Sequence, residues 1–494
     1  MCSSMIATDF YQLTMMQGYL EKNMLEKKAV FDLFYRKPPF GGSYAVACGL
    51  NSALEFIRTL QINSDEVSAL ADAGMEADFC KWLTRNKVGK VGLFEGEVWA
   101  VPEGSLVLPN EPILRVEAPI YMAQVLETPL LNIVNYETLI ATKASRIVNS
   151  AKGKPVMEFG MRRARGITSS VLATRAAFVG GVTSTSNVLA WKEYRIPVSG
   201  TMSHAWVMAF PSEIESFRAY MEQAADNIIL LIDTYDTLES GLPNALAVFG
   251  EMFGSGKFPK VFGVRLDSGD LADLSKKVRA ALDENGFDKG IIVVSNDLDE
   301  YIIESLLAQG AAIDVFGVGT KLVNAEGTPS LGGVYKLAEI EGVPRMKIAG
   351  NLEKMTNPGK KQVWRIWEKE QKGALGEETG PLNFVADILA LEEETFSPSS
   401  ALHLENPARP WMALTLDADS YVIKPMLSRC SLREGSALSG SDPREGRKNL
   451  ELEMKRLRPQ CKRLVNPEIM RLELSPKLSR LKNELIEQYR PDKG

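Results

Sequence analysis

Seven apolar runs between Lys154 and about Ile340 constrain the fold more than any other feature of this sequence. Each run ends in small or polar residues, and most are followed by a stretch with helical apolar spacing. The starts of the runs lie about 20 to 40 residues apart, which is the length of a strand followed by a helix. Continuous apolar strands of this kind form parallel sheets that are covered on both faces. We therefore predict an irregular α/β barrel with the strands PVMEFG, RIPVSGT, NIILLIDTY, KVFGVRLDS, GIIVVSND, DVFGVGT and GGVYKLAEI.

The sequence on either side of these runs has a different pattern. Residues 91–116 alternate apolar and polar positions between proline and glycine turns, which is typical of short antiparallel strands. We expect a β-rich N-terminal α/β accessory domain over 1–140, the barrel with the active site over 141–350, and a C-terminal extension over 351–494 that packs on both. Residues 431–449 are rich in glycine, serine and charge, so we expect a flexible loop there.

Composition excludes several classes of function. The net charge is −6 and basic residues form no long run, so binding of nucleic acid by bulk electrostatics is disfavoured. The longest apolar runs, such as 228–232, are far shorter than the roughly 20 residues that span a bilayer. The five cysteines are scattered and lack CxxC spacing, which favours a reducing compartment. The N-terminus resembles no secretory signal, and we expect a cytoplasmic protein.

Polar and charged residues follow six of the predicted strands. In an α/β barrel the carboxyl ends of the strands line the active-site mouth, because the strand-to-helix loops begin there. We therefore expect the following residues to lie on one side of the barrel: Arg162 and Arg163; Thr201 and His204; Asp233 and Asp236; Arg265, Asp267 and Asp270; Ser295, Asn296 and Asp297; Gly317, Gly319 and Thr320.

The chemistry of this set indicates an anionic substrate. The stretch FGVGTKL places two glycines and a threonine where backbone N–H groups can surround a phosphate, and paired arginines can clamp a phosphate or a carboxylate. Each residue taken alone has an ordinary structural explanation, since Asp270 or Asp297 could cap a helix and one of the arginines could lie on the surface. No P-loop, GxGxxG fingerprint or HExxH motif is present.

Nine stretches of the sequence resemble the nicotinate phosphoribosyltransferase family, in family order and over most of the chain. They are TDFYQLTM, FGGSYAVACGL, EFGMRRARG, GTMSHAWVMAF, LIDTYDT, GVRLDSGDL, VVSNDLDE, GVGTKLV and LGGVYKLAEIEG. The resemblance implies a type II phosphoribosyltransferase fold and a homodimer in which the N-terminal domain of one subunit closes the barrel mouth of the other. It also implies that nicotinate and 5-phosphoribosyl 1-pyrophosphate are joined with release of pyrophosphate, with Mg²⁺ present and ATP hydrolysis coupled to turnover.

The resemblance assigns roles to individual residues. His204 matches the histidine that becomes phosphorylated in members of the family, and Asp233 matches the acid that orients the ring of that histidine. Neutral imidazole is nucleophilic near pH 7, which suits this role. Further roles follow for nicotinate binding (Arg265, Tyr11 and Thr201), for the 5-phosphate (Gly319 and Thr320), for pyrophosphate (Arg162 or Arg163), for charge stabilisation in the transition state (Asp267 or Asp270) and for other substrate contacts (Ser295 and Asn296). Metal ligands remain unassigned.

The sequence departs from the family pattern at a few positions, and two other functions stay open. Ser203 and Ala205 flank the histidine, where the family commonly has alanine before it and serine after it. Arg165 stands where glutamine is common in the family, and Trp191 stands where glycine is common. A nicotinamide phosphoribosyltransferase would act on the neutral amide. A non-catalytic relative would use its phosphate sites only for sensing.

Overall fold

The computed structural model describes residues 3–223, 226–350, 354–369, 383–404, 413–432 and 440–489. The chain divides into two compact units. Residues Met1–Leu139 and Ser330–Gly494 form the first, here called the split unit, and Ile140–Pro329 form the second, the parallel-sheet unit. Helix α6 (Glu127–Ser150) begins in the split unit and ends in the parallel-sheet unit. In the described ranges, no helix has both the length and the apolar character needed to cross a bilayer.

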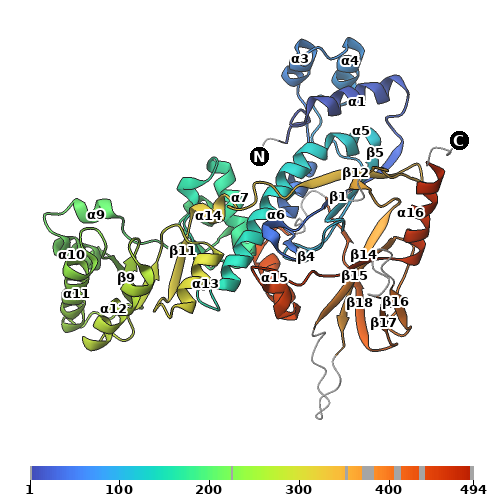
Figure 1. The fold of residues 1–494 in the computed structure, drawn as a ribbon. Coiled ribbons are helices and arrows are strands. Elements are labelled where there is room, and N and C mark those ends of the chain that lie inside the picture. The colour runs from blue at the N-terminus through green and yellow to red at the C-terminus, as the bar shows by residue number, and fades with distance from the viewer. Residues whose placement is uncertain are drawn as a thin grey trace. The chain divides into compact units, whose positions relative to one another are not determined.

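A six-stranded sheet forms the centre of the parallel-sheet unit (Figure 1). Its order is β7-β6-β11-β10-β9-β8, and every neighbouring pair is parallel. Because β7 and β8 are edges, the described strands form a half barrel. The strands are β6 (Val156–Glu158), β7 (Ser184–Thr185), β8 (Asn227–Leu231), β9 (Val261–Leu266), β10 (Ile291–Val294) and β11 (Val315–Val318).

Apolar side chains fill both faces of this sheet, as the continuous apolar runs predict. Ile229, Val293 and Val315 form a buried cluster on one face. The alternate residues Leu230 and Val294 are fully buried as well. Burial on both sides explains why the strands lack the polar alternation of an antiparallel sheet. The predicted α/β class is thus confirmed.

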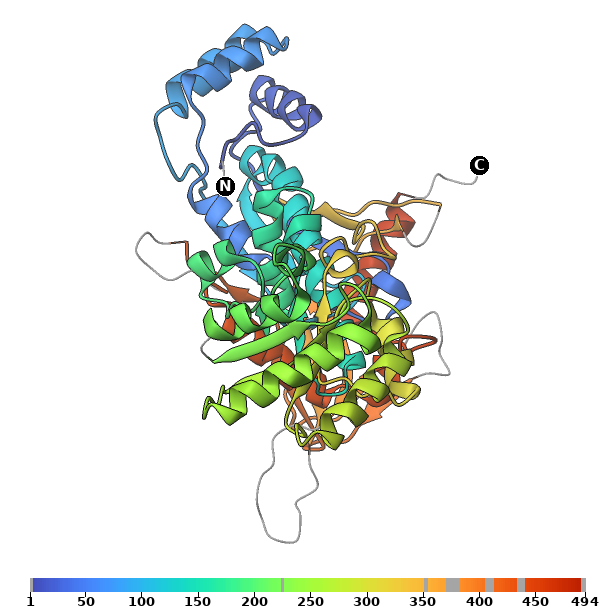
Figure 2. The ribbon, with the colours of Figure 1, turned by 90° about the vertical axis from the view of Figure 1, so that its left-hand side faces the viewer.

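Helices follow the strands of this unit and flank the sheet, as α11, α12 and α13 do in Figure 1 and the green helices facing the viewer do in Figure 2. At the start of α10, the Ser212 hydroxyl accepts from the Glu215 N–H at 3.4 Å. The elements are η2 (Met161–Arg163), α7 (Ile167–Val179), α8 (Val188–Tyr194), α9 (His204–Met208), α10 (Glu213–Gln223), the π-helix η3 (Thr237–Gly241), α11 (Leu242–Gly254), α12 (Leu271–Glu284), α13 (Glu300–Ala308) and α14 (Thr320–Val323).

Two of the seven expected barrel strands differ in the structure. GGVYKLAEI forms β12 (Gly333–Ile340), which pairs antiparallel with β1 (Lys28–Tyr35) in the split unit. Lys336 and Glu339 interrupt its apolar run, which suits a strand with one solvated face. RIPVSGT forms no strand and makes only a single bridge, between Val198 and Thr185. Pro197 lacks the N–H that a longer ladder requires.

The N-terminal part of the split unit contains an antiparallel sheet of order β13-β12-β1-β5-β3-β19. The predicted short strands within 91–116 correspond to β3, β4 and β5. The elements of this part are α1 (Phe10–Glu21), η1 (Pro39–Gly41), β2 (Ala45–Val46), α2 (Leu50–Arg58), α3 (Ser64–Asp72), α4 (Ala77–Asn86), β3 (Glu97–Ala100), β4 (Leu106–Val107), β5 (Leu114–Pro119), α5 (Ile120–Val125), β13 (Val343–Pro344) and β19 (Ser428–Arg429).

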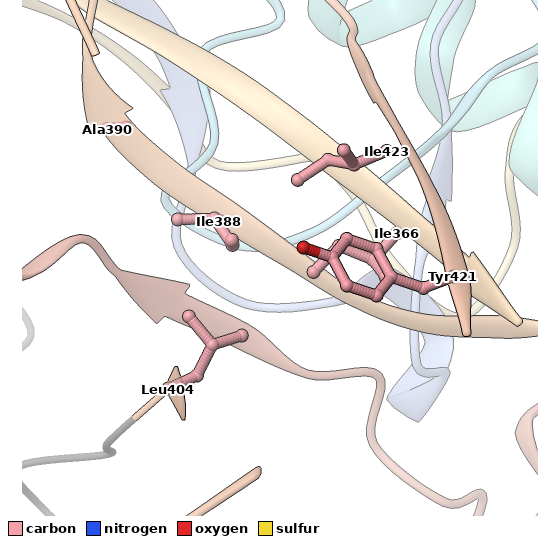
Figure 3. Close-up of a cluster of buried hydrophobic side chains, with 6 residues drawn as sticks. All are labelled: Ile366, Ile388, Ala390, Leu404, Tyr421 and Ile423. Carbon is pink, nitrogen blue, oxygen red and sulfur yellow. The ribbon is translucent and has the colours of Figure 1, made fainter. Parts of the chain in front are cut away.

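The C-terminal part of the split unit contains a second sheet, of order β18-β14-β15-β20. Figure 3 shows the buried cluster that covers one face of it, with Ile366, Ile388 and Tyr421 among its members. The elements are β14 (Lys361–Glu368), β15 (Phe384–Leu391), β16 (Leu402–Leu404), β17 (Leu414–Leu416), β18 (Tyr421–Pro425), α15 (Pro443–Arg456), η6 (Pro459–Lys462), β20 (Leu472–Leu474) and α16 (Pro476–Gln488).

The prediction of a flexible loop over 431–449 is wrong for the last part of that range. Helix α15 begins at Pro443, and the Asp442 side chain caps it by accepting from the Arg444 N–H at 2.9 Å. A capping aspartate followed by proline at the first helical position is a helix start, which the glycine- and serine-rich composition of the stretch concealed. Residues 433–439 lie outside the described residues.

A buried arginine holds the C-terminal part of the split unit together. Arg365 on β14 is 1% exposed; its Nη2 lies 2.7 Å from Asp387 Oδ2 and its Nη1 2.5 Å from Glu453 Oε2. Arg365 also donates to the carbonyl oxygen of Leu106 at 2.6 Å, so one guanidinium joins β14, β15, α15 and β4.

Burial raises the pKa of the nearby Glu111 carboxyl well above its usual value, and the Asp387 carboxylate raises it further.

We expect Glu111→Gln to flatten the pH dependence of thermal stability. The raised pKa of Glu111 means that the folded chain holds this proton more tightly than the unfolded chain. Its stabilising contribution is therefore complete below the ordinary value of 4.5 and is lost as the pH rises through the raised pKa. Glutamine imitates the protonated acid and cannot ionise. Unfolding midpoints measured across a pH series, with the exposed Glu484→Gln as control, should fall less with rising pH in the Glu111 variant; parallel curves would contradict this.

Candidate active site

The ring of His204 lies beside the carboxylate of Asp233, with Nε2 3.2 Å from Oδ1. His204 is the first residue of α9 and follows Ser203, whose backbone is extended. The imidazole side chain is 38% exposed, whereas the Asp233 side chain is 1% exposed. The ring is therefore anchored on one side and accessible on the other. Because Nε2 faces the carboxylate, Nδ1 is the nitrogen left for a reacting group.

Asp233 follows β8 and binds the turn that follows the neighbouring strand β9. Its Oδ2 accepts from the backbone N–H of Asp267 at 2.9 Å and from the hydroxyl of Ser268 at 2.7 Å. The carboxylate thus has donors on both oxygens. These bonds offset the desolvation of an almost fully buried charge.

Arg265 on β9 presents a partly satisfied guanidinium at the same edge of the sheet. Its Nη1 donates to the hydroxyl of Thr201. Its Nε is buried and lacks a hydrogen-bond partner among the described residues. Burial lowers the pKa of Arg265, and the positive charge of Arg162 lowers it further. The carboxylates of Asp267 and Asp233 oppose this shift by raising the pKa. A buried guanidinium with unused donor capacity is suited to binding an anion.

The expected residues after β9 and β10 have different surroundings. Asp267 is half-buried and its Oδ1 accepts from the Ser295 hydroxyl. Asp270 is exposed and caps α12, with Oδ1 accepting from the N–H groups of Ala272 and Asp273 at 3.1 Å each. The capping explanation therefore accounts for Asp270, whereas Asp267 faces the polar edge. Asp236 likewise caps η3, and Asn296 has a φ of 111° at the end of β10.

A buried carboxylate fixes the turn that carries Arg162 and Arg163. Glu158 ends β6, and its side chain accepts from the N–H of Gly160 and, at 2.9 Å and 2.6 Å, from the hydroxyls of Thr174 and Thr185. Burial raises the pKa of Glu158, and these three donors oppose the shift. The arginines follow directly in η2, and both are exposed.

The glycines at the end of β11, Gly317 within the strand and Gly319 after it, pack closely against the β6 end. A Cβ on Gly317 would lie 2.7 Å from the Phe159 ring, and one on Gly319 would lie 3.0 Å from the Phe159 carbonyl oxygen. Only glycine allows this approach, and Thr320 then opens the short helix α14. Among the expected residues, hydrogen bonds join His204 to Asp233, Asp233 to the turn of Asp267, Asp267 to Ser295, and Arg265 to Thr201. Tyr11 lies on α1 of the split unit and is 51% exposed.

Three contributors to this edge were missed by the sequence analysis. The Ser268 hydroxyl contacts Asp233. Tyr220 on α10 lies near Arg265, whose charge lowers the Tyr220 pKa against the larger raising effect of burial. Trp206 packs edge-on against Tyr220 with ring centroids 6.0 Å apart. Ser268 lies inside the strand-end motif and could have been found there, whereas helical periodicity gives no reason to select Tyr220.

Among the residues that the structure describes, no group of three or more histidine, cysteine, aspartate or glutamate side chains could hold a metal ion. Mg²⁺ usually binds to proteins through one or two carboxylates, phosphate oxygens and water.

A parallel sheet whose carboxyl edge gathers an anchored imidazole and a buried guanidinium defines an α/β enzyme for small anionic substrates. The family comparisons then specify which one. The nicotinate phosphoribosyltransferase (NAPRTase) N-terminal domain matches residues 6–135, the NAPRTase family matches 155–374, and the C-terminal domain matches 360–482. The chain belongs to the nicotinate phosphoribosyltransferase family.

Individual relatives agree with this assignment. The chain is 44% identical to nicotinate phosphoribosyltransferase of Bacillus subtilis (strain 168), over 82% of this chain and 80% of the relative. It is 32% identical to nicotinate phosphoribosyltransferase of Homo sapiens, over 98% and 97%. The crystal structure of human nicotinic acid phosphoribosyltransferase superposes with a TM-score of 0.80 at 30% identity, covering 97% of this chain and 99% of that one. The resemblance seen in the sequence motifs is confirmed.

We expect Glu158→Ala to loosen the β6 end, because it leaves the buried Gly160 N–H and Thr185 hydroxyl without an acceptor, while the Thr174 hydroxyl keeps the Ser170 carbonyl oxygen. The local cost is about 2 kcal/mol or more, from roughly 1–3 kcal/mol for each of the two unsatisfied groups. Hydrogen exchange measures this loosening: peptides that cover β6 and α7 should exchange faster in the Glu158→Ala variant than in the wild type. Glu304→Ala, at an exposed position of α13, is the matched control. Unchanged exchange in the Glu158 variant would show that the network contributes nothing.

Proposed function

We propose that the enzyme carries out its nicotinate phosphoribosyltransferase reaction at the carboxyl edge of the parallel sheet, with His204 as a temporary phosphoryl carrier. The reaction joins nicotinate to 5-phosphoribosyl 1-pyrophosphate, releases pyrophosphate and serves the salvage of NAD. The observation that carries the proposal is the placement of one accessible imidazole, its buried acid and a buried arginine on adjacent strand ends.

Arg265 would bind the carboxylate of nicotinate. Its buried Nε has unused donor capacity, and its bond to Thr201 fixes the plane of the guanidinium. We further propose a homodimer in which the N-terminal domain, 1–140, closes the partner's site and brings Tyr11 of the partner subunit to the pyridine ring. The exposure of Tyr11 supports this role, because its side chain is available for a contact outside its own unit.

The transfer step forms one bond and breaks one. The lone pair of the pyridine nitrogen attacks C1 of the ribose, and the bond from C1 to the pyrophosphate oxygen breaks with its electrons. Positive charge develops on the ribose, and the half-buried carboxylate of Asp267 would stabilise it. Gly319 and Thr320 would hold the 5-phosphate, Arg162 or Arg163 the pyrophosphate, and Ser295 and Asn296 the ribose side. Asp270 would contribute only through the cap of α12.

Phosphorylation of His204 would use Nδ1. Its lone pair attacks the γ-phosphorus of ATP, and the bond to the ADP oxygen breaks. Water later attacks the phosphorus, the P–N bond breaks, and orthophosphate leaves with the imidazole restored. Asp233 would keep the proton on Nε2 throughout, so that Nδ1 stays available as the nucleophile.

Mg²⁺ would reach the site with the phosphorylated substrates. Asp267 is the carboxylate suited to face the ion, because Asp236 and Asp270 are committed to helix caps. When bound, the ion would neutralise charge on the departing pyrophosphate.

Incubation with γ-labelled ATP should give an acid-labile, base-stable phosphate on the wild type. His204→Ala should abolish this label, because no other group replaces the imidazole nitrogen. His403→Ala provides the matched control, since the second histidine lies on β16 of the split unit. Label that persists in the His204 variant would exclude the carrier role. No ATP turnover by the wild type with both substrates supplied would favour a sensing relative.

Arg265→Gln should lower kcat/KM for nicotinate on the order of 100-fold, since losing one partner of a buried charge pair costs about 2–5 kcal/mol. Activity with nicotinamide should change little, because the amide carries no charge. Competition assays with both substrates measure the difference, and Arg218→Gln, at an exposed ion pair with Glu251, is the control. A wild type that prefers the amide would overturn the substrate assignment.

A further inference from the structure

We propose that Ser268 is a positioning residue that couples the phosphorylation of His204 to phosphoribosyl transfer. Its hydroxyl donates to Asp233 Oδ2 at 2.7 Å, on the side of the carboxylate opposite the histidine. Ser268 hydrogen-bonds Asp233 and not the imidazole, so it would act through Asp233. The inference rests on the proposed carrier role of His204.

The carboxylate of Asp233 depends on few groups for its solvation. The side chain is 1% exposed, and its donors are the His204 ring, the Asp267 N–H and the Ser268 hydroxyl. Two donors on Oδ2 fix the plane of the carboxylate and thereby aim Oδ1 at Nε2. Loss of the hydroxyl leaves Oδ2 with the backbone donor alone, and the carboxylate can then rotate away from the ring.

The turn after β9 also carries Asp267, the carboxylate that would face the ribose in the proposed reaction. Ser268 follows Asp267, whose Oδ1 accepts from Ser295 on the next strand end. On its other side, Gly269 has a φ of 80°, and Asp270 is held as the cap of α12. The turn is therefore fixed at both ends. A change in the bond between His204 and Asp233 reaches Asp267 through the two bonds on Oδ2.

Nicotinate binding should not depend on the Ser268 hydroxyl. The Arg265 guanidinium is fixed by Thr201, and neither residue hydrogen-bonds Ser268. Removing the Ser268 hydroxyl should therefore slow transfer of the γ-phosphoryl group to Nδ1, with ADP leaving, and leave KM for nicotinate unchanged. The expected effect is about tenfold, the rate equivalent of one hydrogen bond to a charged group. The hydroxyl also ties Asp233 to the turn of Asp267, so without it the phosphohistidine that forms would more often be hydrolysed without phosphoribosyl transfer, and the ATP consumed per nicotinate mononucleotide should rise.

The experiment compares full-length wild type, Ser268→Ala, Ser268→Thr and Ser305→Ala. Threonine restores the hydroxyl, and Ser305 is an exposed serine on α13 that serves as the matched control. Rapid-quench assays with labelled ATP give the rate of phosphohistidine formation. Steady-state assays with nicotinate and phosphoribosyl pyrophosphate give the ratio of ADP to nicotinate mononucleotide and the KM for nicotinate.

Slower phosphorylation and a higher ADP ratio in Ser268→Ala, with recovery in Ser268→Thr, would support the proposal. A Ser268→Ala enzyme with wild-type phosphorylation and coupling would overturn it. Equal impairment of both Ser268 variants, or a raised KM for nicotinate, would also overturn it, because either result indicates a general disturbance of the turn. A wild type that forms no phosphohistidine refutes the carrier role itself, and this result is distinguishable because it precedes any comparison of variants.

Discussion

The register between β8 and β9 is the constraint on which the site depends. Leu231 pairs with Arg265, so the residues two positions further along each strand end, Asp233 and Asp267, come level with each other. This alignment lets the Asp233 carboxylate accept from the next turn at 2.9 Å. A slip of one residue would send the Asp233 side chain to the other face of the sheet. The apolar residues that fix the register, such as Ile229 and Leu230, therefore also fix the acid beside His204.

The sequence alone was sufficient for the parallel sheet and for most of its polar edge. Continuous apolar runs identify strands covered on both faces, and the carboxyl ends of parallel strands meet at one edge, so the grouping of Asp233, Arg265 and Asp267 follows. The pattern failed where tertiary pairing outweighed it. β12 pairs antiparallel with β1 in the split unit, although its apolar residues resemble those of the barrel strands.

Side-chain partnerships were beyond reach of the sequence. An aspartate after a strand can cap a helix or face a substrate, and only coordinates separate Asp270, which caps α12, from Asp267, which does not. The contact of Ser268 with Asp233 likewise depends on a rotamer and on register between strands. The pairing of Arg365 with Glu453 joins residues far apart in the chain, and no local pattern predicts it.

The two-residue period of β9 explains how one strand serves both halves of the proposed chemistry. Successive side chains point to opposite faces, so Arg265 and Asp267 share a face while Leu266 is fully buried on the other. The arginine would bind the negative end of nicotinate, and the aspartate would face the positive charge that develops on the ribose. Opposite charges two residues apart would thus match the carboxylate of one substrate and the ribose of the other. Because Asp233 hydrogen-bonds this same turn, the proposed phosphorylation of His204 would act on the turn that carries Asp267.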